Sequence, residues 1–193
     1  MKNYQLILAS TSPFRQETLK KLQLDFVTAK PDCDETPLLE ETPQQLVMRL
    51  AETKAKSCIV EQPSLVIGSD QVCVIDGEII GKPHSREKAI EQLSRQSGKS
   101  ITFYTGITVW NSETNKADTR LDTFIVHFRD LTHQQIISYV EKDKPYYCAG
   151  SFMSEGLGIA LFKQMEGKDP NTLIGLPLIV LVDMLEAQGT SVL

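Results

Sequence analysis

The stretch QLILASTSPFR, residues 5–15, is the starting point for interpreting the fold. Its first half, QLILA, is a short apolar run of the kind expected for a buried strand. Ser12 and Pro13 follow, and these residue types are preferred at an N-cap and at the first helical position. The stretch therefore predicts a strand that turns directly into a helix over about residues 13–22.

The rest of the chain interleaves strand-like and helix-like segments. We expect further helices over 42–59, 85–96, 132–142 and 178–187. We expect strands over 64–75 (interrupted at 68–70), 78–80, 100–110, 119–128 and in the glycine-rich segment 149–162, with a loop or irregular edge segment over 25–41. This order, with a hairpin at Asp76-Gly77, predicts an α/β fold with a mixed twisted sheet flanked by helices. No repeat or linker is visible, so residues 1–193 are expected to form a single domain.

The overall composition excludes several classes of protein. The net charge is −5 and the pI is about 5.3, without the basic stripe that a nucleic-acid-binding surface needs. No apolar run reaches the length of a membrane span or of a signal-peptide core. The four cysteines lack CxxC spacing, so we expect reduced thiols and a cytoplasmic protein.

The turn after the first strand is a candidate phosphate site. Ser10, Ser12 and Arg15 surround a helix start, where free backbone N–H groups and the helix dipole favour anions. The alternative is a plain helix cap with an exposed arginine, and these residues alone leave the two interpretations near even.

Two acidic positions are candidates for water or metal chemistry. Asp70 ends an apolar strand, where α/β folds commonly place their sites, and an aspartate there can act as general base or bind a metal. Glu35, in the loop Asp34-Glu35-Thr36, offers the oxygen ligands that Mg²⁺ prefers. Taken singly, a turn cap at Asp70 and a solvated loop at Glu35 are the simpler interpretations.

Two lysines complete the candidate set. Lys54 falls in the apolar stripe of its helix, where a lysine either snorkels to solvent or pairs with an anion. Lys82 is held between Gly81 and Pro83 and can present a fixed positive charge to phosphate. The chain contains no GxxxxGK[ST] motif, so it is not a P-loop protein. A serine hydrolase triad is not indicated either, because Ser10 and Ser12 have no evident histidine partner.

The motifs ASTSPFR, DET, GSDQ, GKP, FYTG and NTLIGLP, in this order, resemble those of the Maf family of nucleoside triphosphate pyrophosphatases. The resemblance covers nearly the whole chain. It implies a Maf/ITPase-like α/β fold with two lobes around a central cleft. It also implies a metal-dependent hydrolase that splits a triphosphate between its α and β phosphates, and homodimers are common in the family.

The resemblance also implies roles for individual residues. Asp70 matches the catalytic base, and Glu35 with Asp70 matches the side that takes a divalent cation, Mg²⁺ or Mn²⁺. The phosphate-binding positions are matched by Ser10, Ser12, Arg15, Lys54 and Lys82. These assignments are an analogy that only geometry can test.

Three positions resemble the YceF-type branch, which acts on 7-methyl-GTP. They are Phe14, where that branch usually has tryptophan, Gln71 and Glu155. A carboxylate such as Glu155 accepts the adjacent N–H donors of guanine, and an aromatic face suits a cationic methylated base. The alternatives are pyrophosphatases for dTTP, UTP, ITP or XTP, and a regulatory nucleotide-binding protein linked to septum formation.

Overall fold

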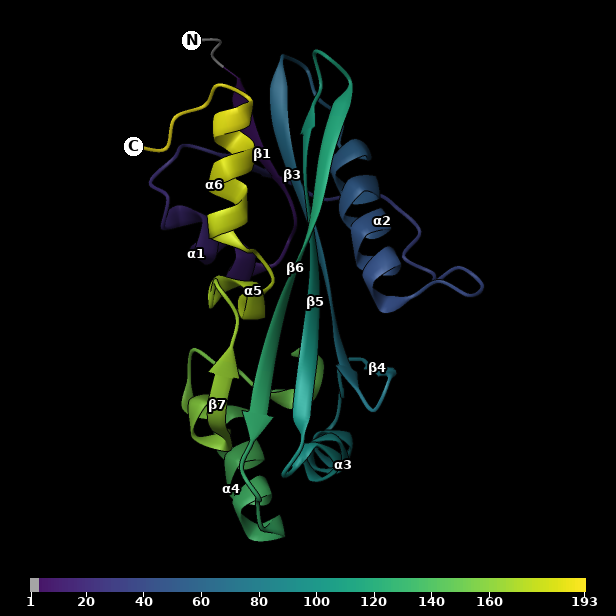
Figure 1. The fold of residues 1–193 in the computed structure, drawn as a ribbon, viewed down its shortest axis with the longest axis vertical. Helices are drawn as coiled ribbons and strands as arrows, with labels where there is room; N and C mark the ends of the chain where they lie inside the picture. Colours follow the sequence, from purple (N-terminus) through teal and green to yellow (C-terminus); the bar gives the residue numbers. More distant parts are fainter. Residues whose placement is uncertain (1–3) are drawn as a thin grey trace. The chain divides into compact units, whose positions relative to one another are not determined.

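A computed structural model describes residues 4–193, which divide into two compact units. Unit 1 contains the chain up to Gln71, together with Tyr104–Asp122 and Lys168–Leu193. Unit 2 contains Val72–Phe103 and Thr123–Gly167. The long strands β3, β5 and β6 contribute residues to both units, and each unit is described separately below (Figure 1).

The strands form a mixed sheet, as predicted. They are β1 (Gln5–Ala9), β2 (Val27–Ala29), β3 (Ser64–Ile75), β4 (Glu78–Ile80), β5 (Ser100–Asn111), β6 (Lys116–Phe128) and β7 (Phe162–Glu166). The order is β2-β1-β3-β5-β6-β7, with β4 paired to β3. β1 runs parallel to β2 and β3, whereas the pairs β3–β4 and β6–β7 are antiparallel.

In unit 1, helices cover both faces of the sheet (Figure 1). They are α1 (Pro13–Lys20), α2 (Pro43–Lys56), the short α5 (Asn171–Ile174) and α6 (Leu178–Ala187). Because successive side chains of a strand point to opposite faces, β1 contributes to two cores. Leu6 and Leu8 belong to the core that includes residues of α1 and α6, and Ile7 and Ala9 belong to the core that includes residues of α2.

Unit 2 contains α3 (Arg86–Gln96), α4 (His133–Asp143) and two 3₁₀ turns, η1 (Ala149–Ser151) and η2 (Leu157–Leu161). Four phenylalanines form a cluster of edge-to-face pairs with centroid separations of 4.8–5.7 Å. Its members are Phe103, Phe128, Phe152 and Phe162. Phe152 takes part in three of the four pairs, so it anchors the segment between η1 and η2 in the core of unit 2.

The helix-start predictions are confirmed. Ser12 caps α1, and Thr42 and Thr132 each form a capping box with the glutamine three residues later. The helix after Thr42 is shorter than expected, since α2 ends at Lys56 and Ile59 is 92% exposed.

Two strand predictions were wrong. β3 continues through residues 68–70, because Gly68 stays extended and lets α2 approach the strand. The glycine-rich segment 149–162 forms η1 and η2, with β7 beginning only at Phe162, because Ser151 adopts a left-handed φ of 61° that a strand does not accommodate. Of the two alternatives for residues 25–41, the edge segment is correct for β2, an edge strand of three residues.

Candidate active site

The centre of the site in unit 1 is a buried lysine between two carboxylates. Lys54 Nζ donates hydrogen bonds to Asp70 Oδ1 at 2.6 Å and to Glu35 Oε2 at 2.8 Å. Lys54 is 6% and Asp70 8% exposed, whereas the Glu35 side chain is 58% exposed. Of the two interpretations of Lys54, pairing with an anion is therefore correct. The structure brings together three residues that are 16 and 19 positions apart in sequence.

The close packing of α2 on β3 makes this pairing geometrically accessible. A Cβ added to Gly68 would lie 2.1 Å from the carbonyl oxygen of Ala51 and 2.8 Å from the amide nitrogen of Ala55. Only glycine therefore allows the helix backbone to lie against this strand. Lys54 lies between Ala51 and Ala55 in α2, and Asp70 lies two residues beyond Gly68 in β3, so the close approach helps bring their charged groups together.

The environment of Asp70 suits a general base. Burial raises the pKa of its carboxyl group above the ordinary value, while the positive charges of Lys54 and Arg15 act in the opposite direction. A raised pKa makes the carboxylate a stronger proton acceptor than an exposed aspartate. The site thus contains a buried carboxyl group whose ionised form is stabilised by the positive charges of Lys54 and Arg15.

The turn from β1 to α1 holds the three predicted phosphate-binding residues. Ser10 Oγ accepts a hydrogen bond from the amide of Ser12 at 3.1 Å, and Ser12 Oγ accepts one from the amide of Arg15 at 3.4 Å. The Arg15 side chain donates to the backbone carbonyls of Gly175 (2.9 Å) and Ser69 (2.8 Å). Burial lowers the pKa of its guanidinium, and the negative charges of Asp70 and Glu35 oppose this shift. Arg15 therefore stands in the field of the two carboxylates with a fixed orientation.

Gly175 and Ser69 have positioning roles that the sequence reasoning missed. Gly175 ends α5 with φ of 97°, and its carbonyl oxygen accepts hydrogen bonds from both Arg15 and the Ser69 hydroxyl. The Ser69 hydroxyl is also 2.9 Å from the carbonyl oxygen of Gly106. The available signal was the order helix-glycine-leucine-proline at the end of NTLIGLP, which is typical of a left-handed helix end.

The loop that carries Glu35 is fastened at its base by an ion pair. Arg49 of α2 donates to both carboxylate oxygens of Glu41, at 2.6 and 2.8 Å, and to the carbonyl oxygen of Thr36. The Arg49 guanidinium lowers the pKa of Glu41 to about 2. Asp34 accepts hydrogen bonds from the amide and hydroxyl of Thr36, and these bonds lower its pKa. These contacts hold the loop residues on either side of Glu35.

The donor set fits a divalent cation of the Mg²⁺ type. Glu35 and Asp70 direct carboxylate oxygens at one positively charged atom, the ammonium nitrogen of Lys54. Within residues 4–193 no group of three or more His, Cys, Asp or Glu side chains is placed to hold a metal ion. Mg²⁺ commonly binds through one or two carboxylates, with water and substrate phosphates as its remaining ligands. Two carboxylates are therefore a sufficient protein contribution.

Two of the three predicted specificity residues also belong to unit 1. The Gln71 amide nitrogen donates to the Thr105 hydroxyl and to the carbonyl oxygen of Thr172, at 2.9 and 2.6 Å. The side-chain amide oxygen of Gln71 accepts no hydrogen bond from the described residues. The bonds of the amide nitrogen fix the orientation of this oxygen, which can act as an acceptor. Phe14 is 43% exposed, next to Arg15 in α1.

Lys82 and Glu155 belong to unit 2, and both are exposed. The thiol of Cys148 lies in the field of Glu155 and Lys82, and of Asp143. Burial, reinforced by the charge of Glu155, raises the pKa of this thiol. Lys82 and Glu155, 73 positions apart in the sequence, are thus brought near one residue. Their predicted roles towards phosphate and base remain predictions.

The fold resembles that of a solved structure, the Staphylococcus aureus Ham1 protein. The TM-score is 0.54 with 17% identity, over 95% of this chain and 99% of that chain, a likeness that shows the fold alone. The family follows from the sequence. Residues 5–188 match the protein-family model described as Maf-like protein, so this chain belongs to the Maf family.

Curated relatives are similar over their whole length. Proteins named 7-methyl-GTP pyrophosphatase from Vibrio vulnificus and Vibrio cholerae are 66% and 64% identical over 100% of both chains. One of the same name from Aliivibrio fischeri is 65% identical, over 97% of this chain and 98% of its own.

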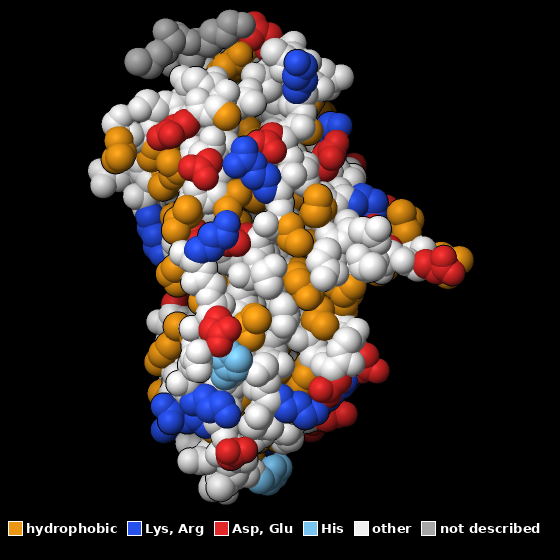
Figure 2. All heavy atoms as spheres, in the orientation of Figure 1, with side chains coloured by type: hydrophobic (Ala, Val, Ile, Leu, Met, Phe, Trp, Pro, Cys, Tyr) orange, Lys and Arg blue, Asp and Glu red, His pale blue; other side chains and the backbone are white. Residues whose placement is uncertain are grey.

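On the face shown in Figure 2, acidic and basic side chains are interspersed, and no continuous basic band is visible. None of the helices within residues 4–193 has the length and apolar character needed to traverse a bilayer.

Proposed function

We propose that this protein is a nucleoside triphosphate pyrophosphatase that hydrolyses 7-methyl-GTP to 7-methyl-GMP and diphosphate. The observation that carries the proposal is the buried carboxylate of Asp70, with its raised pKa, bonded to Lys54. Membership of the Maf family and the similarity to proteins named 7-methyl-GTP pyrophosphatase support this substrate.

The reaction needs an activated water and compensation of phosphate charge. Asp70 accepts a proton from the water that attacks the α phosphorus, and the diphosphate leaves. The negative charge of the triphosphate is balanced by Arg15, Lys54 and Lys82, while Ser10 and Ser12 bind phosphate at the helix start. Positioning and charge stabilisation provide most of the acceleration in such transfers.

A divalent cation, Mg²⁺ or Mn²⁺, belongs to this proposal. Glu35 and Asp70 would hold it, and when bound it neutralises phosphate oxygens and stabilises the leaving diphosphate. Lys54 bonds one oxygen of each carboxylate, Glu35 Oε2 and Asp70 Oδ1, and so holds the two groups on either side of one ammonium nitrogen.

The base would be read by three side chains. Glu155 accepts the N–H donors on the pairing edge of guanine, and Gln71 offers its unbonded carbonyl oxygen. Phe14 supplies an exposed aromatic face to the positively charged methylated base, with less area than tryptophan and no indole donor. The proposal also includes a single domain over residues 1–193, a homodimer, and a cytoplasmic place of action.

The decisive experiment measures diphosphate release from 7-methyl-GTP, GTP, dTTP, UTP, ITP and XTP, with and without Mg²⁺ or Mn²⁺. The wild-type chain should prefer 7-methyl-GTP. Asp70→Asn should lose roughly 10²–10⁴-fold in kcat while keeping its fold by circular dichroism. Asp183→Asn is the matched control, because Asp183 is an exposed aspartate of the same unit on α6.

Each outcome has a definite meaning. Near-normal turnover by Asp70→Asn would remove Asp70 from the mechanism. A preference for dTTP, UTP, ITP or XTP would keep the pyrophosphatase and contradict the 7-methyl-GTP assignment. Tight nucleotide binding without any hydrolysis would favour the regulatory binding protein.

A further inference from the structure

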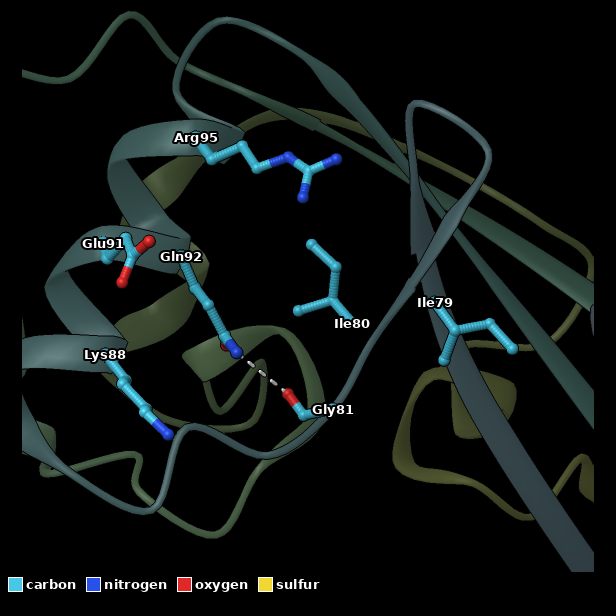
Figure 3. Close-up of a pocket in the computed structure, with 7 residues that line it drawn as sticks. All are labelled: Ile79, Ile80, Gly81, Lys88, Glu91, Gln92 and Arg95. Carbon is cyan, nitrogen blue, oxygen red and sulfur yellow. Dashed lines mark hydrogen bonds between the residues drawn. The ribbon is translucent and has the colours of Figure 1, made fainter. Parts of the chain in front are cut away.

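Gln92 connects two segments of unit 2 that carry predicted substrate-binding residues. It lies on α3, beside a surface hollow lined by residues of α3 and of β4 with the following Gly81 (Figure 3). Its amide nitrogen donates to the carbonyl oxygen of Gly81 at 3.2 Å, and its amide oxygen accepts a hydrogen bond from the Ser151 hydroxyl. Both ends of one side chain are therefore in use, each on a different segment.

The first of these segments ends in Lys82. Gly81 directly precedes Lys82, so the bond from Gln92 restrains the peptide unit from which that lysine projects. The hydrogen bond between the amide of His84 and the carbonyl oxygen of Tyr146 restrains the other side of Lys82. The backbone that carries the lysine is thus held on both sides.

The second segment carries Glu155. Ser151 is fully buried with φ of 61°, so it depends on specific contacts to remain in this conformation. Gln96 donates to the carbonyl oxygen of Gly150 at 2.9 Å, and the Tyr139 hydroxyl accepts from the amide of Met153 at 3.0 Å. The chain entering Glu155 is therefore fastened to α3 and α4.

We propose that Gln92 is a positioning residue that sets Lys82 and Glu155 together, one through each end of its amide group. The geometric basis is the pair of hydrogen bonds that Gln92 makes, to the carbonyl oxygen of Gly81 and from the Ser151 hydroxyl. The charges of Glu155 and Lys82 also both act on the Cys148 thiol. This inference rests on the proposed function, in which Lys82 binds phosphate and Glu155 reads the base. An amide is suited to this task because it donates at one end and accepts at the other.

The two ends can be separated by substitution. Gln92→Glu keeps an acceptor for Ser151 but cannot donate to Gly81 at neutral pH. Ser151→Ala removes only the bond to the Glu155 segment, and Gln92→Met removes both bonds. Glu91→Gln is the control, because Glu91 is an exposed neighbour on the same helix that lines the same hollow.

The measurement is kcat/KM for 7-methyl-GTP and for UTP, with the melting temperature of each variant. Gln92→Glu should lower kcat/KM for both nucleotides by a similar factor. We expect roughly 2- to 12-fold, the range for one lost hydrogen bond. Ser151→Ala should lower only the value for 7-methyl-GTP, by a factor in the same range, and thus lower the ratio of the two. Gln92→Met should combine both effects, and Glu91→Gln should match the wild type.

Two results would overturn the inference. One is that both Ser151→Ala and Gln92→Met keep the wild-type ratio of kcat/KM for 7-methyl-GTP to kcat/KM for UTP. The other is a Gln92→Glu variant that turns over UTP as the wild type does, even if its melting temperature falls. The ratio of kcat/KM for 7-methyl-GTP to that for UTP in the wild type tests the proposed function. The change of this ratio in each variant tests the role of Gln92, whichever of the two nucleotides the wild type prefers.

Discussion

At the scale of single residues, the site consists of buried charges that stabilise one another. Asp70 and Lys54 would each be costly to bury alone, and pairing with good geometry offsets part of that cost. Sequence alone indicated Lys54, because a lysine in an apolar stripe is locally unusual. Asp70 taken singly was more simply a turn cap at a strand end, and the structure instead places it inside β3, which continues to Ile75. The partners of Arg15 were not predictable, since Ser69 and Gly175 lie 54 and 160 positions away.

The raised pKa of Asp70 has a consequence for the pH dependence of the reaction. The base works only when ionised, so activity is lost as the pH falls through its pKa, which lies above the ordinary 3.8. We expect the carboxyl group of Asp70 in the metal-free protein to titrate above that value. The measurement is a carbon-13 NMR titration of the aspartate carboxyl groups without divalent metal, with Asp70→Asn to assign the signal. Titration of Asp70 at or below pH 3.8 would contradict the raised pKa.

The same shift affects stability with a defined sign. Because the folded state holds the proton of Asp70 more tightly than the unfolded chain, this group favours folding at low pH, and its contribution is lost as the pH rises through the folded pKa. The contribution of Glu41 to stability changes with pH in the opposite direction. Its pKa is lowered from 4.5 to about 2, so its contribution is present above 4.5 and lost as the pH falls towards 2.

At the scale of elements, the capping signals were reliable because they depend on neighbouring residues alone. Thr42 and Thr132 have both partners of their capping boxes within three positions. The segment 149–162 was misjudged because its conformation depends on distant residues, including Gln92, Gln96 and Tyr139. Local composition cannot reveal such contacts.

Gly68 gives a prediction at this scale. In Gly68→Ala the new Cβ would meet backbone atoms of α2, so the helix must move and carry Lys54 away from Asp70. We expect a loss of ~1–3 kcal/mol in the free energy of unfolding. We also expect kcat to fall by up to roughly 10²-fold, the effect of a displacement of about 1 Å.

A suitable control is Gly77→Ala. Gly77 has φ of 80° with open space around it, so alanine there strains the backbone by ~1–2 kcal/mol without touching α2. This variant should lose stability and keep its kcat. Denaturant unfolding and diphosphate release measured on both variants separate the two effects. Normal turnover by Gly68→Ala would show that the close approach at this strand does not control the catalytic pair.

At the scale of the whole molecule, the mixed sheet and the family were both predictable from sequence. The motifs that indicate them are spread along nearly the full chain. The family resemblance implied two lobes, and the chain divides into two compact units. The residues at which it divides were not predictable, because three long strands contribute to both units and no linker separates them. The expectation of one domain over residues 1–193 stays a prediction.

The cysteines give a prediction for the whole chain. All four are free, and burial raises the pKa of each of the fully buried thiols, that of Cys73 to about 12. Few thiolates are therefore present at neutral pH. We expect the same melting temperature with and without reductant, slow labelling of Cys58 and Cys73 in the native protein, and four reactive thiols after unfolding. Fewer than four without reductant would reveal a disulfide.

The hydrogen bonds that Gly175 accepts from Arg15 and Ser69 have a consequence during synthesis. A nascent chain that has reached only residue 170 already contains Ser10, Arg15, Lys54 and Asp70. It lacks the carbonyl group on which Arg15 and Ser69 converge, and it lacks α6 of the core next to β1. This part of the candidate site therefore stays incomplete in the nascent chain until residues 171–187, which form α5 and α6, have also been synthesised.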